Sequence, residues 1–228
     1  MPKVNAYRSE PYRTSSFKRH VGRRTLLPHS QIKRLETLLK RNKDAQKILR
    51  AAPRLKMPNW YLAAGGISQT VWNVLHTFEP ENGIKDYDVV YYDSSDLSYK
   101  REDDFIQKAK QLFHEVSVPV EVRNQARVHL WYPQRFGYEI RPHQNVEDAI
   151  RTFPATATCV GVKYVDGHFH VYAPYGLDDL FGLIVRPNRS QIAAIVRDPE
   201  KAREVYEAKV ERWSKLWPKL QVIPWGDQ

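Results

Sequence analysis

Two aspartates border a run of residues that is typical of a buried strand. Asp86 and Asp88 stand at the start of Asp86–Tyr92, where Val89 to Tyr92 are β-branched or aromatic. Residues two apart on a strand point to the same face of a sheet. Carboxylates are almost never fully buried unless something pairs with them. The chain must therefore set against this face either a cation or basic neighbours such as Lys85 and Arg123.

A strand, a glycine pair and a helix precede these acids. Trp60–Ala64 predicts a strand that ends at Gly65 and Gly66, and Ser68–Leu75 predicts a short helix. Glycines let a phosphate approach the backbone, and the first free N–H groups of a helix point toward it. This stretch therefore predicts an anion site.

The rest of the chain alternates helices and strands, which predicts an α/β domain. We expect a small mixed sheet with helices packed mainly on one face, plus an N-terminal helical region. The other expected helices are one starting at Ser30, pausing near Asn42 and ending before Pro53, then Lys100–His114, one capped by Asn145, Gly176–Leu183, and one from Asp198 to Pro218. The other expected strands are one starting at Val118, then Thr156–Val165 and His168–Ala173, the last two joined by an Asp166-Gly167 hairpin turn.

Composition limits the classes of partner and compartment. The 228 residues carry a net charge of +10, which favours anionic partners such as nucleotides or nucleic acid, although many basic proteins bind neither. The single Cys159 excludes an internal disulfide framework and a zinc site made of cysteines alone. No apolar run approaches the roughly 18 residues of a membrane helix, and the first residues contain no signal-peptide core. We expect an intracellular protein, most simply cytoplasmic, with no membrane partner.

The first residues differ from the rest of the chain. Residues 1–28 form a basic segment in which only Glu10 opposes the positive side chains. Such a segment is a flexible basic arm, a nuclear or organellar targeting signal, or a plain solvated tail. We expect three parts: this arm at 1–28, a helical region at 29–57, and one domain at 58–228.

A third acid gives the aspartates a chemical context. Glu121 interrupts the β-branched neighbours Val120 and Val122 on a later strand. Oxygen-rich clusters suit Mg²⁺, which prefers carboxylates and substrate phosphate oxygens. Two such ions can hold the attacking and leaving oxygens of a phosphoryl transfer.

The order of these features resembles the DNA-polymerase-β-type nucleotidyltransferase superfamily. Its pattern is Gly-Gly or Gly-Ser, then Asp-x-Asp/Glu, then a third acid. More narrowly, the chain is similar to a nucleotidyltransferase-like family of bacteria and fungi. The matching stretches, from about Trp60 to Trp217, are AAGGISQTVWNVLH, IKDYDVVYYD, VEVRNQARVHLW, FPATATCVGV, YAPYGLDDLF and RWSKLWP. The segment from Gly66 to Asp86 is longer than is usual in the superfamily, and the excess fits a loop at Phe78–Gly83.

The resemblance implies a role for each matching residue. Asp86 and Asp88 would bind the Mg²⁺ or Mn²⁺ that holds a nucleoside triphosphate. Glu121 would bind the second metal or take the proton of the acceptor hydroxyl. The β- and γ-phosphates would be held by the following residues: Gly65, Gly66 and Ser68.

Arg127 is the remaining candidate for phosphate binding. Its guanidinium could hold a phosphate through two hydrogen bonds, and Asn124 or Gln125 could contact a sugar or base. The alternative is that these buried groups tie strand ends together.

Two other features have simpler explanations. His168 and His170 share one face of a strand, a spacing compatible with zinc, yet an exposed hairpin face explains them better. Trp213 and Trp217 most simply dock the last helix on the core, with a nucleobase platform as the alternative.

The implied reaction is metal-dependent transfer of a nucleoside monophosphate to an acceptor hydroxyl, with release of pyrophosphate. RNA, protein, an antibiotic-like small molecule and a metabolite are all open as acceptors. Two other functions are open as well: a nucleotide- or RNA-binding protein that has lost turnover, and a structural or interaction protein.

Overall fold

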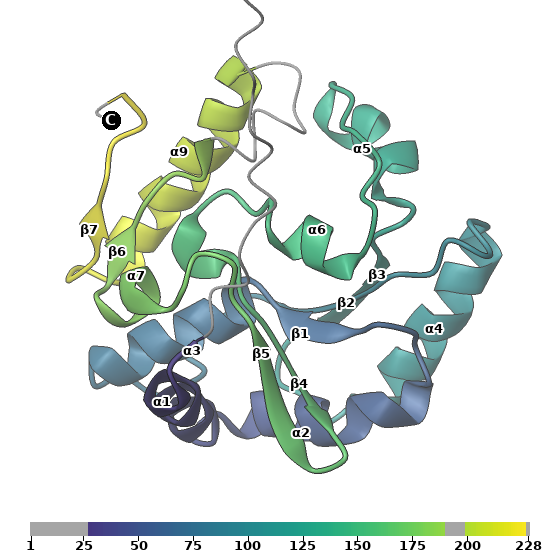
Figure 1. Ribbon diagram of the computed structural model, residues 1–228, viewed down its shortest axis with the longest axis horizontal. Coiled ribbons are helices and arrows are strands. Elements are labelled where there is room, and N and C mark those ends of the chain that lie inside the picture. The colour runs from purple at the N-terminus through teal and green to yellow at the C-terminus, as the bar shows by residue number, and fades with distance from the viewer. Residues whose placement is uncertain (1–26, 190–198, 227–228) are drawn as a thin grey trace, which may run out of the picture.

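A computed structural model describes residues 27–189 and 199–226 and contains a five-stranded mixed sheet (Figure 1). The strand order is β3-β2-β1-β4-β5. β2 and β3 are parallel, and the other neighbours are antiparallel. The strands are β1 (Tyr61–Ala63), β2 (Tyr87–Tyr91), β3 (Val120–Asn124), β4 (Gly161–Val165) and β5 (His168–Tyr172), with a separate parallel pair, β6 (Ile184–Val185) and β7 (Gln221–Val222). The expected α/β class with a small mixed sheet is confirmed.

Helices connect these strands and cover both faces of the sheet. The helices are α1 (His29–Leu39), α2 (Lys43–Ala51), α3 (Gly65–Leu75), α4 (Tyr99–Leu112), α5 (Val128–Phe136), α6 (Val146–Ile150), α7 (Asp178–Phe181) and α9 (Pro199–Leu216), with 3-10 turns at Ala52–Leu55 and Thr156–Thr158. α4 is the crossover between the parallel strands β2 and β3, as such strands require. Figure 1 shows α2 and α4 on one side of the sheet and α6 on the other.

The main core lies on the face that most helices cover. Leu62 from β1, Val89 from β2 and Val122 from β3 point into it and meet apolar side chains of α1, α2, α3, α4 and α9. A smaller cluster lies on the opposite face, where α6 packs against β1 and β2. The period-2 alternation of the strands thus separates a thick core from a thinly covered face.

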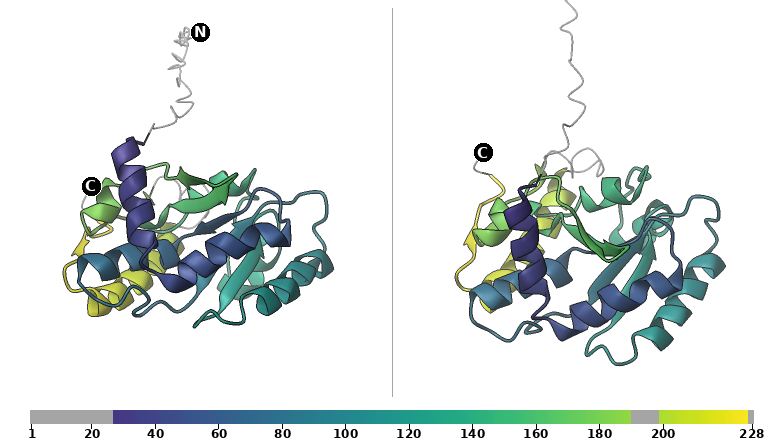
Figure 2. Two further views of the ribbon diagram at one scale, coloured as in Figure 1. Left: turned by 90° about the horizontal axis from the view of Figure 1, so that it is seen from below. Right: turned by 60° about the horizontal axis from the view of Figure 1, so that its bottom comes forward.

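Asn42 ties the N-terminal helices to the sheet. It caps α2 by accepting a hydrogen bond from the Ala45 N–H at 2.8 Å. Its amide donates to Thr70 Oγ1 at 2.7 Å and to the Tyr87 hydroxyl at 2.9 Å. Figure 2 shows α1 crossing α3, against which it packs. The pause expected near Asn42 is present, and the region 29–57 shares one core with the sheet.

The last helix docks through tryptophans. Trp217 is fully buried and Trp213 nearly so, and both rings meet the Trp72 ring edge-on at centroid distances of 5.5 and 5.3 Å. The Trp217 indole Nε1 donates to Asn73 Oδ1 at 2.6 Å. This arrangement matches the simpler of the two roles considered for these tryptophans.

Some expected boundaries are wrong. No helix is expected from the sequence at Val128–Phe136, yet α5 forms there with Pro133 inside it. The strand expected from Thr156 begins only at Gly161, because Thr156–Thr158 forms a 3-10 turn. The expected basic arm lies outside the described residues, apart from residues 27 and 28. Asp198, the expected start of the last helix, lies outside them as well. Within the described ranges, no helix combines the length and apolarity that a membrane span needs.

Trp217→Phe tests the tryptophan dock. Phenylalanine keeps an aromatic ring but leaves the Asn73 oxygen without its donor in a buried site. The free energy of unfolding is expected to fall by about 1–3 kcal/mol, as measured by urea denaturation. Trp225→Phe is the control, because that ring is half exposed beside Tyr206. Equal destabilisation by both changes would contradict this account.

Candidate functional site

Three carboxylates gather on the thinly covered face of the sheet. In the parallel pairing of β2 with β3, Asp88 lies directly opposite Glu121. Residues opposite each other on paired strands point to the same face. Asp86 precedes β2 by one residue and lies two residues from Asp88. The sheet thus brings together the three acids that the sequence singled out.

The carboxylates act on one another electrostatically. Burial, together with the negative charges of Asp86 and Glu121, raises the pKa of Asp88 to about 7. The positive charges of Lys209 and Arg123 oppose this rise in pKa. Asp88 is therefore a half-buried acid whose charged form a nearby cation would stabilise.

Arg123 supplies one positive charge beside these acids. Its Nη2 lies 3.1 Å from Glu121 Oε2, so the pairing expected for an acid beside Arg123 occurs at Glu121. No set of three or more His, Cys, Asp or Glu side chains converges on a metal position within residues 27–189 and 199–226. The donor chemistry nevertheless fits Mg²⁺ or Mn²⁺, since Asp86, Asp88 and Glu121 offer oxygen ligands and the half-buried Asp88 lies among like charges. Arg123 contacts only one of the two carboxylate oxygens of Glu121, so Oε1 remains for a metal.

The turn between β1 and α3 lies next to Asp88. Ala63, the last residue of β1, pairs with Asp88. Ala64 then takes φ 57° and ψ −132°, a conformation that L-residues rarely adopt. Its carbonyl accepts the N–H groups of Ile67 and Ser68. Gly65, the first residue of α3, follows Ala63 by two residues. The free N–H groups at the start of this helix therefore lie close to the strand position opposite Asp88.

The glycine pair differs from the sequence prediction in one respect. α3 begins at Gly65 rather than at Ser68, so both glycines belong to its first turn. A Cβ at Gly66 would lie 2.5 Å from Tyr87 Cδ1, and one at Gly65 would lie 2.6 Å from Gln69 Nε2. The Tyr87 ring therefore requires the glycine at 66, whereas the flexible Gln69 side chain could move away from a Cβ at 65. The N–H groups of both glycines have no acceptor within the helix.

The structure places Ser68 away from the expected phosphate. The residue is fully buried, and its hydroxyl donates to the Ala157 carbonyl at 2.8 Å. A hydroxyl has only one proton to donate. A phosphate site at this turn therefore does not include the Ser68 hydroxyl, contrary to the expectation.

Arg127 is also committed elsewhere. Its Nη1 forms an ion pair with Glu102, and its Nε donates to the Leu97 carbonyl at 2.7 Å. Glu102 also accepts the Asn124 N–H at 2.8 Å. Arg127 thus ties the end of β3 to α4, which is the alternative considered for it, and it is not available to a phosphate.

Two cations of α9 approach the acids. Neither is among the site residues expected from the sequence. Lys209 acts on the charge of Asp88, and Asp86 acts on Arg212, whose pKa burial lowers. Arg212 also donates to the Gly83 carbonyl. The signal was available: one face of α9 changes from apolar Ala202 and Val205 to these bases.

The hairpin histidines do not join the site. His168 and His170 are both exposed on β5, at the far edge of the sheet from β3. This placement matches the exposed hairpin face considered for them.

Comparisons with known proteins agree with this geometry. The family described as Nucleotidyltransferase matches residues 50–222. A solved NMR structure, described as revealing a CCA-adding enzyme head domain, matches with a TM-score of 0.68 and 25% identity, covering 88% of this chain and 98% of that chain. No curated protein matches the chain. The family match covers more than half of the residues, so the chain belongs to this nucleotidyltransferase family.

Proposed function

We propose that the protein transfers a nucleoside monophosphate from a nucleoside triphosphate to an acceptor hydroxyl, in a metal-dependent reaction. The observation that supports this most directly is the register of β2 and β3, which sets Asp88 opposite Glu121 in a nucleotidyltransferase fold. Asp86 and Asp88 would hold Mg²⁺ or Mn²⁺, and Glu121 would hold a second ion or take a proton. Such ions neutralise phosphate charge and orient the attacking and leaving oxygens.

The proposed reaction is a single displacement at the α-phosphorus. The acceptor oxygen forms a bond to the α-phosphorus, and the bond from this phosphorus to the oxygen bridging to the β-phosphate breaks. Pyrophosphate leaves with the electron pair of that bond. The hydroxyl proton passes to the Glu121 carboxylate, whose Oε2 is paired with Arg123. The N–H groups of Gly65 and Gly66 would bind phosphate oxygens at the start of α3.

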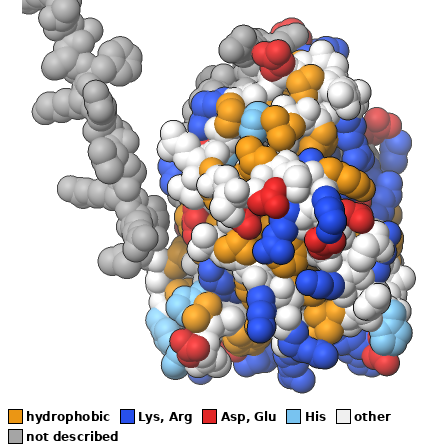
Figure 3. Space-filling view, turned by 90° about the vertical axis from the view of Figure 1, so that its right-hand side faces the viewer, with side chains coloured by type: hydrophobic (Ala, Val, Ile, Leu, Met, Phe, Trp, Pro, Cys, Tyr) orange, Lys and Arg blue, Asp and Glu red, His pale blue; other side chains and the backbone are white. Residues whose placement is uncertain are grey.

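Two observations favour RNA as the acceptor. The neighbouring structure is described as a CCA-adding enzyme head domain. The chain carries a net charge of +10, and Lys and Arg side chains spread over the side where α4 and α5 lie (Figure 3). Positive surfaces attract the phosphate backbone of nucleic acids.

The decisive test is incubation of the pure protein with each labelled triphosphate and Mg²⁺ or Mn²⁺, with and without RNA. Transfer of label to RNA supports the proposed reaction and identifies the base. Binding of triphosphate without any product would instead identify a protein that keeps the fold without turnover.

The double change Asp86→Asn and Asp88→Asn tests the metal ligands. It is expected to abolish Mg²⁺-dependent triphosphate binding in isothermal titration calorimetry. The melting temperature of the metal-free protein is expected to rise, because two half-buried carboxylates that repel each other are lost. Asp103→Asn is the control, since Asp103 accepts a hydrogen bond from Gln107 within α4. Parental binding by the double variant would remove the metal assignment.

Glu121→Gln separates the binding of triphosphate from transfer. Triphosphate affinity is expected to stay within a few-fold of the parent, because Asp86 and Asp88 remain. The transfer rate is expected to fall by about a hundredfold or more, in the range typical of general acid–base groups. Glu115→Gln, at a carboxylate that is 71% exposed, serves as control. Unchanged transfer by Glu121→Gln would exclude Glu121 from the reaction.

A further inference from the structure

A small apolar pocket lies between α5, α6 and α9. Its volume is about 140 Å³. Its walls include Val128, Tyr132, Ala149, Phe153, Ala202 and Val205. A cavity of about 150 Å³ with apolar walls can hold one benzene ring. The pocket therefore suits one planar ring system rather than a larger apolar ligand.

The pocket is on the same side of the sheet as the acids. Val146 and Ile150 of α6 pack on Tyr61 and Ala63 of β1, in the cluster opposite the main core. Ala63 lies opposite Asp88 in the sheet. α6, which contributes Ala149 to the pocket, therefore covers the face that carries the carboxylates.

β3 runs from the acids to the pocket. Glu121 and Arg123 share a face of β3, and Gln125, in the turn directly after the strand, lines the pocket. Four residues of strand span about 13 Å. This span suits a ribose and a chain of phosphates.

α9 also extends from the pocket to the acids. Ala202, Val205, Lys209 and Arg212 follow the spacing of one helix face, and the first two line the pocket. The other two lie within electrostatic reach of the carboxylates. From Ala202 to Arg212 the helix rises about 15 Å. One face of α9 is therefore apolar at the pocket and cationic at the acids.

Two buried polar side chains line the pocket. Gln125 and His143 are each 7% exposed. The His143 Nδ1 lies 3.8 Å from Asp148 Oδ2 and has no hydrogen-bond partner. An amide carries both donors and an acceptor, and a neutral imidazole carries one of each. These groups suit the edge of a ring that presents nitrogen and oxygen atoms.

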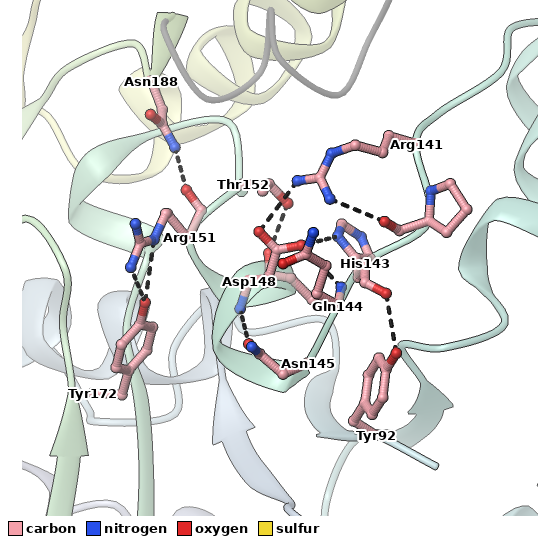
Figure 4. Close-up of polar contacts among 12 residues, drawn as sticks. Tyr92, Arg141, His143, Gln144, Asn145, Asp148, Arg151, Thr152, Tyr172 and Asn188 are labelled. Carbon is pink, nitrogen blue, oxygen red and sulfur yellow. Dashed lines mark hydrogen bonds and ion pairs between the residues drawn. The ribbon is translucent and has the colours of Figure 1, made fainter. Parts of the chain in front are cut away.

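A polar network holds His143 in place (Figure 4). The Tyr92 hydroxyl donates to the His143 carbonyl at 3.1 Å. Asp148 accepts the Gln144 N–H at 3.0 Å and lies 3.2 Å from the Arg141 guanidinium. Contacts with His143, Arg141 and Gln144 hold the pKa of Asp148 well below its usual range. The segment that carries His143 is therefore preorganised.

We propose that this pocket binds the nucleobase of the triphosphate, while Lys209 and Arg212 bind its phosphates. This inference rests on the proposed function and adds an orientation to it. The apolar walls would cover the faces of the base, and Gln125 and His143 would read its edge. The phosphates would then extend along α9 toward Asp86 and Asp88.

The test compares ligands with and without a base. Isothermal titration calorimetry in Mg²⁺ uses the α,β-methylene analogues of the four nucleoside triphosphates, in which the bond that must break is blocked, and inorganic tripolyphosphate. Ala202→Leu fills the pocket, and Val205→Phe fills it from a half-buried position that is easier to accommodate in the fold. Ala208→Leu, on the exposed side of the same helix, is the matched control. Folding of each variant is checked by circular dichroism.

The pocket variants are expected to weaken binding of at least one analogue tenfold or more and to leave tripolyphosphate within twofold. Lys209→Ala is expected to weaken both ligands, and Ala208→Leu neither. Parental affinity of a folded pocket variant for all four analogues would overturn the inference and leave the proposed function intact. Failure of the parent protein to bind any analogue or tripolyphosphate would overturn both.

Discussion

The in-register pairing of β2 with β3 is the constraint on which the site depends. It sets Asp88 opposite Glu121 and at the same time sends Val89 and Val122 into the main core. A slip of one residue would exchange the two faces of a strand, exposing its apolar side chains and burying its acids. The hydrophobic core therefore fixes the positions of the carboxylates, although it contains none of them.

The sequence predicted most elements because strong local signals mark them. Asn42 caps a helix, and Asp166-Gly167 closes a hairpin between β4 and β5. α5 was missed because its residues mix β-branched, aromatic and proline side chains, and tertiary packing stabilises it against this composition. Helix α3 starts early because Ala64 takes an unusual conformation that no local pattern indicates.

The acids could be found from the sequence, whereas their partners could not. Asp86, Asp88 and Glu121 stand out because each interrupts or borders an apolar strand. The side chains of Ser68 and Arg127 contact residues that are far away in the chain, namely Ala157 and Glu102. The approach of Lys209 to Asp88 likewise depends on where α9 packs. Local spacing marks the basic face of α9, but the acid that this face meets follows from tertiary structure alone.

The crossover through α4 also has a consequence for the order of folding. Asp88 and Glu121 are far apart in the chain and meet only when β2 and β3 pair. Helices α3 and α4 form from local contacts, whereas a parallel pairing must first close the loop between its strands. The repulsion between the carboxylates is therefore absent while the helices form and arises as the sheet closes. The charged centre therefore cannot exist before β2 and β3 have paired.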